Sequence, residues 1–569
     1  MPAWFLAVKV FYALTNFRRV ASARAVLGVE PAMDILAQFS SPFEAFAASA
    51  ARRPEVAFLA APASAALPYA PEGFRHLYGN FAVSVTALRA EYAAAGYGCG
   101  ARVALMLGNR PAFFAHWLAL NALGVSIVPL NADLRPEELS FQLGMARTGL
   151  VVAAAEHVAQ IREAGPGTCR VIVDGEPIPA FAGHILRQAG RLEDECALLF
   201  TSGSTGKPKG CRLSNRYFLQ VAAWFHGQGG IAAMTGDPEV NLTPLPMFHM
   251  NALGCSAVGM MVIGGTVVPL DRFHAGTWWA SVADSGATMV HCLGVIPAIL
   301  LRLPPHEAER RHVARFAFAP SVDVGHRATF EARFNLPIVD AWAMTETGGA
   351  AATTTAREPK GFGARCIGRP AVGMQWRIVD QDGLDVTDGR PGEFLVRAAG
   401  SDPRAGFFSG YLDDEAATEA AWEGGWFHTG DYVRVAPDGL FTFFDRKKSI
   451  VRRSGENIAV LEVETVLHRL EGVEATAVTP VDDELRGEEV FAFIIRSAEG
   501  PVVDAEQIVR RCAESLAYHK LPGYVAFVSS LPLSATRKLA RGDIKLLAAA
   551  AVRDGTAFDT RLLKGGLRK

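Results

Sequence analysis

The chain has 569 residues, too many for one hydrophobic core, so we expect a large domain with a smaller second one. It carries 56 lysine and arginine residues against 58 aspartate and glutamate residues, and this balance excludes a strongly basic nucleic-acid-binding surface. Half of the residues are hydrophobic and one fifth are charged, which excludes a disordered chain.

Residues 1–40 are predicted to form a helical extension. Its apolar residues recur near helical spacing, at Trp4, Phe5, Val8, Phe11 and Tyr12. Lys9 interrupts the apolar run and no basic region precedes it, so neither a signal peptide nor a membrane-spanning helix is expected. A helix packed on the domain surface is the favoured interpretation, and peripheral contact with a membrane or a partner is the alternative.

Helices and strands alternate between residues 80 and 155, and the same rhythm returns between 240 and 300, where a strand is expected over 240–248. Hydrophobic strands bounded by glycine and followed by helices are typical of a parallel sheet covered on both faces. The predicted fold class is therefore α/β. After residue 365, short strands separated by Asp-Gly turns at 382–383 and 438–439 predict a β-rich subdomain of hairpins.

The last part of the chain predicts a compact α+β domain, because helical and strand patterns of similar length alternate in it. A short charged segment, residues 446–448, separates this part from the β-rich subdomain. We place the large domain at 41–445, a hinge at 446–448 and a small C-terminal lid domain at 449–569.

A segment rich in glycine and hydroxyl groups follows a hydrophobic strand that ends near residue 200. Backbone N–H groups, hydroxyls and ammonium groups together can surround a polyphosphate. The segment is not a Walker A loop, because Thr201 stands where that motif requires glycine and Pro208 follows Lys207. A flexible surface loop is the alternative. The candidate phosphate-binding residues are Thr201, Ser202, Gly203, Ser204, Thr205, Gly206, Lys207 and Lys209.

Further motifs follow this segment in chain order. They are LPMFHMNAL (245–253), AWAMTET (341–347), GWFHTGD (425–431), FFDRKKSIVRRSGENIAVLEVE (443–464) and LPLSATRKLARGDIK (531–545). Together with FTSGSTGKPKG (200–210), they resemble the motifs of the adenylate-forming superfamily, which includes acyl-CoA synthetases, peptide-synthetase adenylation domains and luciferases. The resemblance extends from about residue 43 to about residue 545 and is greatest for crotonobetaine/carnitine-CoA ligases.

Chemistry and resemblance together suggest roles at residues 342–346. The Thr345 hydroxyl suits a phosphate oxygen, and the Glu346 carboxylate is the hard oxygen ligand that Mg²⁺ prefers. The resemblance implies that Thr345 contacts the α-phosphate, that Glu346 holds the metal and that Trp342 stacks on adenine. The alternatives are a helix N-cap with an acid in its first turn for the pair, and core packing for Trp342.

Asp431 follows Thr429 and Gly430 in a predicted turn, where its carboxylate can accept hydrogen bonds from two vicinal hydroxyls. The resemblance assigns Asp431 to the ribose and Arg446 to the ribose or phosphate. It also assigns Lys448 to the hinge and Gly455 to the pantetheine tunnel. A plain turn aspartate is the alternative for Asp431.

Lys538 matches the late lysine of the family, which stabilises charge on the acyl phosphate during adenylation. Arg537 stands where relatives usually carry glycine. The alternative for Lys538 is a solvated basic strand end. His249 is expected to line the acyl pocket, and Ala319 and Pro320 to contact adenine through their backbone.

The resemblance implies an ATP-dependent carboxylic acid–CoA ligase that forms an acyl-AMP intermediate, with ATP, Mg²⁺ and coenzyme A as cofactor and co-substrates. About 31 residues follow Lys538, too few for a carrier domain, which favours coenzyme A as the acceptor. The alternatives are a non-CoA acceptor and a catalytically weak homologue that binds acyl-CoA or nucleotide. No nucleic-acid partner is expected.

The nature of the acid and the assembly are less constrained. Aromatic residues near the acyl motifs suggest a wall that attracts a quaternary ammonium group by cation–π interaction, formed by Trp224, Phe225, His226, His249 and His291. Short-chain, medium-chain and aryl acids are the alternatives, and a homodimer is the assembly to test. The eight cysteines include no Cys-x-x-Cys pair, so no zinc site or disulfide framework is expected and a cytoplasmic location is favoured.

Overall fold

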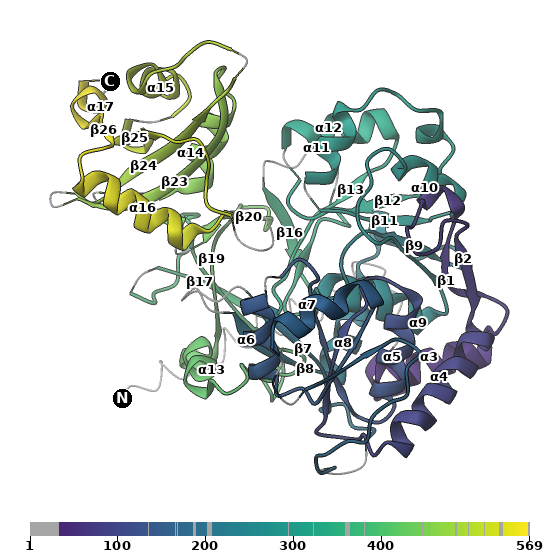
Figure 1. The fold of residues 1–569 in the computed structure, drawn as a ribbon. Coiled ribbons are helices and arrows are strands. Elements are labelled where there is room, and N and C mark those ends of the chain that lie inside the picture. Colours follow the sequence, from purple (N-terminus) through teal and green to yellow (C-terminus); the bar gives the residue numbers. More distant parts are fainter. Residues whose placement is uncertain are drawn as a thin grey trace, which may run out of the picture.

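The structure is a computed structural model that describes residues 34–566, with gaps. The gaps are 135, 166, 168, 186–188, 202–207, 294, 323, 359–364, 381, 447–448, 454–455, 484–485, 499, 517 and 534–538. The described strands form four sheets, three in a large body and one in a separate C-terminal unit coloured yellow-green in Figure 1. The predicted α/β class and the second domain are confirmed. Most of the predicted extension 1–40 and the hinge residues 447–448 lie outside the described part.

One sheet of the large body has the strand order β13-β12-β11-β9-β10-β1-β2 and is parallel except for the pair β1–β2. Its strands are β1 (Ala57–Ala61), β2 (Phe74–Leu77), β9 (Val240–Thr243), β10 (Thr266–Pro269), β11 (Met289–His291), β12 (Phe316–Phe318) and β13 (Ile338–Val339). The strand predicted over 240–248 ends at Thr243, because Pro244 and Pro246 cannot donate ladder hydrogen bonds.

A second sheet has the order β6-β5-β3-β4-β7-β8 and is parallel except for the pair β7–β8. Its strands are β3 (Arg102–Met106), β4 (Ser126–Pro129), β5 (Leu150–Ala153), β6 (Arg170–Val173), β7 (Glu195–Thr201) and β8 (Lys209–Ser214). Both faces are buried, since Val103 and Leu105 of β3 join one hydrophobic core while Ala104 and Met106 join another. This double burial explains the continuous apolar runs in the sequence.

The third sheet is antiparallel, in the order β14-β15-β16-β20-β19-β18-β17. Its strands are β14 (Ala341–Trp342), β15 (Thr353–Thr354), β16 (Cys366–Pro370), β17 (Met374–Val379), β18 (Gly392–Ala398), β19 (Phe427–Val435) and β20 (Phe441–Arg446). The turn at 438–439 joins β19 to β20 as predicted, with Gly439 at φ 84°. The turn at 382–383 lies within a longer connection between β17 and β18.

The C-terminal unit contains a sheet in the order β22-β21-β24-β25-β26, and β23 pairs with β24. Its strands are β21 (Ile450–Arg453), β22 (Glu456–Ala459), β23 (Val473–Asp483), β24 (Gly487–Arg496), β25 (Tyr524–Phe527) and β26 (Phe558–Asp559). Its helices are α14 (Val460–His468), α15 (Ala505–Cys512), α16 (Arg541–Arg553) and α17 (Arg561–Gly566). The predicted alternation of helix and strand in this part is therefore confirmed.

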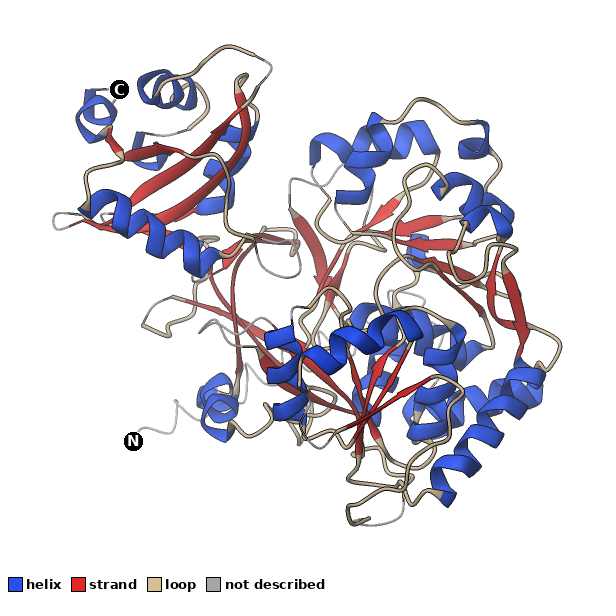
Figure 2. Ribbon diagram, in the orientation of Figure 1, coloured by secondary structure: helices blue, strands red, loops and turns tan. Residues whose placement is uncertain are grey.

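Helices cover the sheets of the large body (Figure 2). They are α2 (Ile35–Gln38), α3 (Pro42–Arg52), α4 (Tyr78–Ala94), α5 (Pro111–Asn121), α6 (Pro136–Ala146), α7 (Val158–Glu163), α8 (Asn215–Gly227), α9 (Gly259–Ile263), α10 (Trp278–Asp284), α11 (Val295–Arg302), α12 (Val324–Phe334), α13 (Glu415–Ala421) and the π-helix η4 (Asn251–Val258). None of the described helices is both long and apolar enough to cross a membrane.

Helix α8 is the element against which two candidate site segments pack. It begins directly after β8, where the hydroxyl of Ser214 accepts a hydrogen bond from the backbone N–H of Tyr217 and caps the helix. A Cβ atom at Gly349 would lie 2.5 Å from the carbonyl oxygen of Gln220, and one at Gly254 would lie 2.5 Å from a methyl group of Val221. The two glycines therefore let the segment after β14 and the helix η4 approach α8 closely.

Candidate active site

The candidate site begins where β12 and β13 end side by side. These strands are parallel, so the segments that leave them meet at one edge of the sheet. Ala319 donates a backbone hydrogen bond to Val339, at 3.0 Å. Asp340 then accepts hydrogen bonds from the backbone N–H groups of Ser321, at 3.1 Å, and Ala341, at 2.8 Å. Asp340 thus connects the predicted adenine-contacting loop to the motif that contains Glu346.

Asp340 is not a candidate in any of the sequence motifs, although it directly precedes AWAMTET. Its burial raises the pKa of its carboxyl group to about 6, while the hydrogen bonds from Ser321 and Ala341 and the charge of Arg327 act in the opposite direction. Ser321 has φ 65°, a left-handed conformation that is uncommon for residues other than glycine. The carboxylate of Asp340 holds the backbone in that conformation.

The residues after β14 form consecutive turns, so the alternative of a helix N-cap at Thr345 is wrong. Glu346 is buried, and its Oε1 accepts a hydrogen bond from the hydroxyl of Tyr411 at 3.0 Å. Its carbonyl oxygen accepts from the backbone N–H of Phe408 at 2.9 Å. The hydroxyl of Tyr217 donates to the carbonyl oxygen of Thr345 at 2.8 Å. The backbone of the pair is thus fixed on both sides, while the Thr345 side chain lies half-buried.

The candidate phosphate segment lies at the tip of the β7–β8 hairpin, where Thr201 and Lys209 are opposite each other. Residues 202–207, which supply most of the predicted phosphate contacts, lie outside the described part. The Nζ atom of Lys209 lies 4.4 Å from the centre of the Tyr411 ring, within cation–π range. Tyr411 therefore contacts both the end of the phosphate segment and Glu346. Nothing in its sequence context identifies it as a site residue.

Asp431 lies within β19, so the predicted turn at this residue is wrong. The strand continues through Gly430, at φ 66°, because the ladder between β18 and β19 shifts register there. The Asp431 carboxylate is buried, and its Oδ2 accepts a hydrogen bond from Nε1 of Trp342 at 2.8 Å. Its Oδ1 makes no hydrogen bond in the described structure but lies 3.1 Å from Nε of Arg446. Burial raises the pKa of Asp431, and the charge of Arg446 opposes this shift.

In the structure, Trp342 is packed in the core, which is the alternative to the predicted stacking on adenine. Its ring is buried and lies 4.9 Å from that of Phe394, while its Nε1 is bonded to Asp431. Stacking of Trp342 on adenine stays a prediction. The structure adds a second function for this ring, because the indole N–H fixes the orientation of the Asp431 carboxylate.

His249 is exposed, and its ring contacts that of Phe248 at a centroid distance of 4.7 Å. The turn that precedes it is held by the buried side chain of Asn109. The Asn109 amide donates to the carbonyl oxygens of Leu245, at 2.9 Å, and Leu270, at 2.7 Å, and its oxygen accepts from the backbone of Met247. Asn109 is, after Asp340 and Tyr411, a third supporting residue that lies outside every sequence motif.

Two of the five residues of the predicted aromatic wall, Phe225 and His291, are buried in the core. Phe225 and His291 are both 0% exposed, and their ring centroids lie 5.2 Å apart. His291 is also bonded to Ser256 at 2.7 Å and Asn241 at 3.1 Å, and burial lowers its pKa to about 3. A neutral, hydrogen-bonded and enclosed ring offers no face to a ligand in this structure. Trp224 is half-buried, and its Nε1 has no hydrogen-bond partner in the described structure.

Several predicted site residues lie outside the described part, namely Ser202, Gly203, Ser204, Thr205, Gly206, Lys207, Lys448, Gly455 and Lys538, as does Arg537. Their roles stay predictions. Within the described residues, no group of three or more histidine, cysteine, aspartate or glutamate side chains could hold a metal ion. A metal at Glu346 therefore needs other oxygen ligands, which fits Mg²⁺, since it is usually bound by one or two carboxylates together with substrate phosphates and water.

Comparison with known proteins agrees with the motifs. A model of the AMP-binding enzyme family matches residues 46–412, and a model of the AMP-binding enzyme C-terminal domain matches residues 462–538. The chain belongs to the AMP-binding enzyme family. The resemblance predicted from the motifs is thereby confirmed.

Curated relatives of this AMP-binding enzyme include two bacterial proteins. The crotonobetaine/carnitine–CoA ligase of Salmonella paratyphi A is 27% identical over 465 residues, which cover 78% of this chain and 88% of that protein. The crotonobetaine/carnitine–CoA ligase of Citrobacter koseri is 28% identical over 477 residues, covering 80% of this chain and 90% of that protein.

Solved structures share the fold of this AMP-binding enzyme. The o-succinylbenzoate CoA synthetase of Bacillus subtilis, in complex with its acyl-adenylate intermediate, has a TM-score of 0.73 at 23% identity and covers 88% of this chain and 97% of its own. An anthranilate CoA ligase in complex with anthranoyl-AMP has a TM-score of 0.75 at 20% identity and covers 91% and 98%, respectively. At these identities the likeness concerns the fold.

Replacing Asp340 with asparagine tests the buried carboxyl group. Its pKa is about 6 in the folded chain against 3.8 for the ordinary group, so the folded state binds the proton more tightly. The wild-type free energy of unfolding should therefore fall, relative to Asp340→Asn, as the pH rises from about 4 to above 6, by about 2 to 3 kcal/mol. Urea unfolding across this range measures it. Parallel pH profiles for the two proteins would contradict the assignment.

Proposed function

We propose that this protein is an AMP-forming, ATP-dependent carboxylic acid–CoA ligase. Membership of the AMP-binding enzyme family supports the reaction class. The observation that carries the proposal at the level of residues is the convergence on Tyr411 of Glu346 and Lys209. A carboxylate suited to Mg²⁺ is thereby held next to a lysine at the end of the phosphate segment, as polyphosphate chemistry requires.

The first half-reaction joins the acid to AMP. A carboxylate oxygen of the acid attacks the α-phosphorus of ATP, the bond to the bridging oxygen breaks, and pyrophosphate leaves with that electron pair. Both reactants are anions, so positioning and charge stabilisation supply most of the catalysis. We assign the phosphate contacts to the segment 201–209 and to Thr345. Lys538 neutralises charge that develops on the α-phosphate, and no protein nucleophile is needed.

Mg²⁺ would be held by Glu346 and, when bound, would neutralise charge on the phosphate oxygens. The surroundings of Glu346 fit this assignment. Its Oε1 is oriented by the hydroxyl of Tyr411, and its backbone is fixed by Phe408. A carboxylate whose position is set by neighbours in this way can accept a cation without first reorganising.

The ribose is assigned to Asp431. Its Oδ2 accepts the hydrogen bond from Trp342, while its Oδ1 makes no hydrogen bond in the described structure and lies 3.1 Å from Nε of Arg446, whose charge balances it. A ribose hydroxyl can supply the hydrogen bond that this buried oxygen lacks. We assign Arg446, whose side chain is 62% exposed and is paired with Asp431, to the sugar or a phosphate.

In the second half-reaction the thiol sulfur of coenzyme A attacks the carbonyl carbon of the acyl adenylate. The bond between that carbon and the phosphate oxygen breaks, AMP leaves, and the thiol proton passes to solvent. We propose that the C-terminal unit rotates about the hinge between the two steps, withdrawing Lys538 and bringing the segment near Gly455 to the pantetheine. Such a rotation concentrates its backbone changes in a few residues.

The proposed substrate is a betaine-like carboxylic acid, as in the relatives named crotonobetaine/carnitine–CoA ligase. The half-buried ring of Trp224 is a candidate for an aromatic face toward a quaternary ammonium group. A non-CoA acceptor and a catalytically weak homologue are the competing functions. A cytoplasmic location, a homodimer and peripheral contacts of the N-terminal segment stay predictions.

A panel of acids tests the proposed function. The wild-type protein should release pyrophosphate and AMP with ATP, Mg²⁺ and coenzyme A, with betaine acids preferred over aliphatic and aryl acids. Coupled assays for both products measure this. Aliphatic or aryl acids that far outperform betaines would contradict the substrate assignment. An absence of acid-dependent pyrophosphate release would contradict the proposed ligase activity.

Lys538→Ala tests the assigned charge stabilisation. Adenylate formation should fall roughly 10²- to 10³-fold, as when one donor to a developing oxyanion is lost. Single-turnover formation of acyl-AMP measures the step, and Lys545→Ala is a matched control from the same part of the chain. An unchanged rate in Lys538→Ala would contradict the role.

Tyr411→Phe separates the two contacts of Tyr411. The ring beneath Lys209 stays, but the donor to Glu346 is lost, so the Mg²⁺ concentration for half-maximal rate should rise several-fold, corresponding to about 1 kcal/mol. The rate at saturating Mg²⁺ should change little. Magnesium titration of pyrophosphate release measures both quantities.

Tyr78→Phe is the control for this variant. It also removes a tyrosine hydroxyl that donates a hydrogen bond, but the acceptor is the carbonyl oxygen of Gly265, at 2.9 Å, and not a site residue. An unchanged Mg²⁺ dependence in Tyr411→Phe would argue against a link between Tyr411 and the metal.

A further inference from the structure

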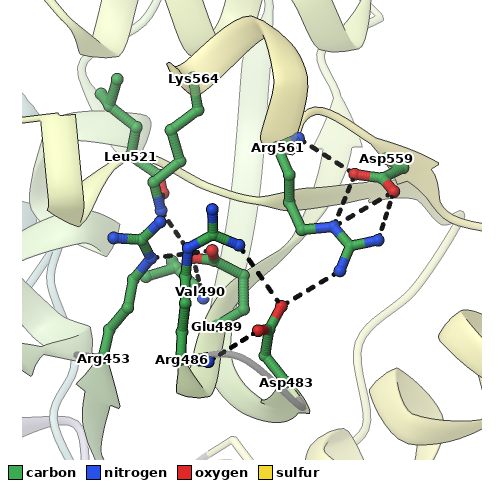
Figure 3. Close-up of polar contacts among 9 residues, drawn as sticks. All are labelled: Arg453, Asp483, Arg486, Glu489, Val490, Leu521, Asp559, Arg561 and Lys564. Atoms are coloured by element: carbon green, nitrogen blue, oxygen red, sulfur yellow. Dashed lines mark hydrogen bonds and ion pairs between the residues drawn. The ribbon is translucent and has the colours of Figure 1, made fainter. Parts of the chain in front are cut away.

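A buried ionic network lies in the C-terminal unit, apart from the candidate site (Figure 3). At its centre is the carboxylate of Glu489 on β24, which is 0% exposed. Its Oε1 accepts hydrogen bonds from Nζ of Lys564 at 2.6 Å and from the backbone N–H of Val490 at 2.9 Å. Its Oε2 accepts from Nε of Arg453 at 2.8 Å. We call Arg453, Glu489 and Lys564 the Glu489 network.

Lys564 brings the last described helix into this network. Its side chain extends from α17 beneath the surface, is 1% exposed, and also donates to the carbonyl oxygen of Leu521 at 2.6 Å. Thr560, just before α17, donates from its hydroxyl to the carbonyl oxygen of Pro522 and from its backbone to that of Gly523. Helix α17 is therefore attached to the segment 521–523 and to β24 at the same place.

The absence of a side chain at Gly523 leaves room for the side chain of Glu489. A Cβ atom at Gly523 would lie 2.4 Å from Cγ and 2.5 Å from Cδ of Glu489, well inside any tolerable contact. Gly523 also donates a backbone hydrogen bond to Val490. Glycine at this position thus leaves the space in which the carboxylate meets its two cations.

Arg453 connects the network to the strand that follows the hinge. It is the last residue of β21 and pairs with Gly487 of β24 and with Glu456 of β22. Its side chain is 6% exposed, and its guanidinium lies 6.0 Å from the centre of the Tyr518 ring. The network therefore spans from the last described helix to the β21–β22 hairpin, and the proposed pantetheine-contacting Gly455 lies between these two strands in the sequence.

The charges in this network do not favour stability. Two cations share one buried carboxylate, and burial lowers the pKa of Lys564 to about 8, with Arg453 and Arg486 adding to the shift and Glu489 opposing it. Replacing a whole buried ion pair or triad by apolar residues is often neutral or stabilising, whereas removing one partner is destabilising when it leaves a buried charge unpaired. A surface cluster of Asp483, Arg486, Asp559 and Arg561 lies beside the network. Its two arginine side chains are 33% and 35% exposed, so water screens their ion pairs in part.

We propose that Lys564 is a positioning residue for the thioester-forming half-reaction. It acts through Glu489 on Arg453 and so fixes the orientation of the β21–β22 hairpin relative to the rest of the C-terminal unit. This inference rests on the proposed function, because the hairpin matters to catalysis only if it meets coenzyme A. Adenylation does not use the hairpin and is independent of the network.

Lys564→Met tests the proposal, since it removes one cation and leaves Arg453 paired with Glu489. The rate at which preformed acyl-AMP reacts with coenzyme A should fall roughly 10- to 100-fold, as expected when a reacting group is misplaced from a distance. The rate of acyl-AMP formation should stay as in the wild type, because Glu489 keeps Arg453 as its partner and adenylation does not use the hairpin. Hydrogen exchange should become faster at the described amides of β21 and β22.

Two further variants test the same role without relying on Lys564→Met alone. Gly523→Ala displaces the Glu489 side chain without removing a charge and should reproduce the selective loss. Arg561→Met removes a cation of the same helix that faces the surface cluster and should leave both half-reactions unchanged. If Lys564→Met slows both half-reactions equally, or slows neither, the proposed role of Lys564 is wrong.

The wild-type protein separates this inference from the proposed function. If it forms no acyl-CoA from any acid, the proposed function fails, and the inference fails with it as a statement about catalysis. If it forms acyl-CoA but Lys564→Met does so at the wild-type rate with unchanged exchange in the hairpin, the inference alone fails.

Discussion

The hydrogen bond from Tyr411 to Glu346 is the contact on which the geometry of the candidate site depends. It joins segments that are 65 residues apart in the chain. The backbone supports the contact from both sides, because residue 411 pairs with Cys211 of β8 while Phe408 donates to the carbonyl oxygen of Glu346. The end of the phosphate segment, the carboxylate and the aromatic ring are thereby held in one arrangement, and a phosphate–metal site can be preorganised rather than assembled on binding.

Buried carboxylates organise the rest of the molecule in a similar way, although their surroundings differ. Asp340 accepts backbone N–H groups from two segments, Asp431 is oriented by an indole N–H, and Glu489 is shared by two cations. Each must be satisfied by defined donors, because an unpaired charge in a protein interior is strongly unfavourable. Directional pairing of this kind fixes loop and strand positions that apolar packing alone leaves free.

The two parts of the chain are built for different tasks. In the large body, parallel sheets buried on both faces give a rigid platform, and close approach at Gly254 and Gly349 seats two site segments against α8. The C-terminal unit has its own hydrophobic core and its own ionic network. A unit with its own core can move about a short joint without losing its shape, as the proposed rotation would require.

The sequence by itself determined the fold class, the order of the domains and the motifs, because apolar periodicity, turn residues and charged groups are local properties of the chain. It also suggested a metal role for Glu346 and a ribose role for Asp431, since a carboxylate carries its chemistry in its own atoms, and these roles stay predictions. Only the tertiary structure identified Tyr411, Asp340, Asn109 and Lys564, and only it showed that Asp431 lies in a strand and that Phe225 and His291 are enclosed. These roles depend on contacts between segments far apart in the chain, and burial and hydrogen-bond partners are fixed only when those segments pack together.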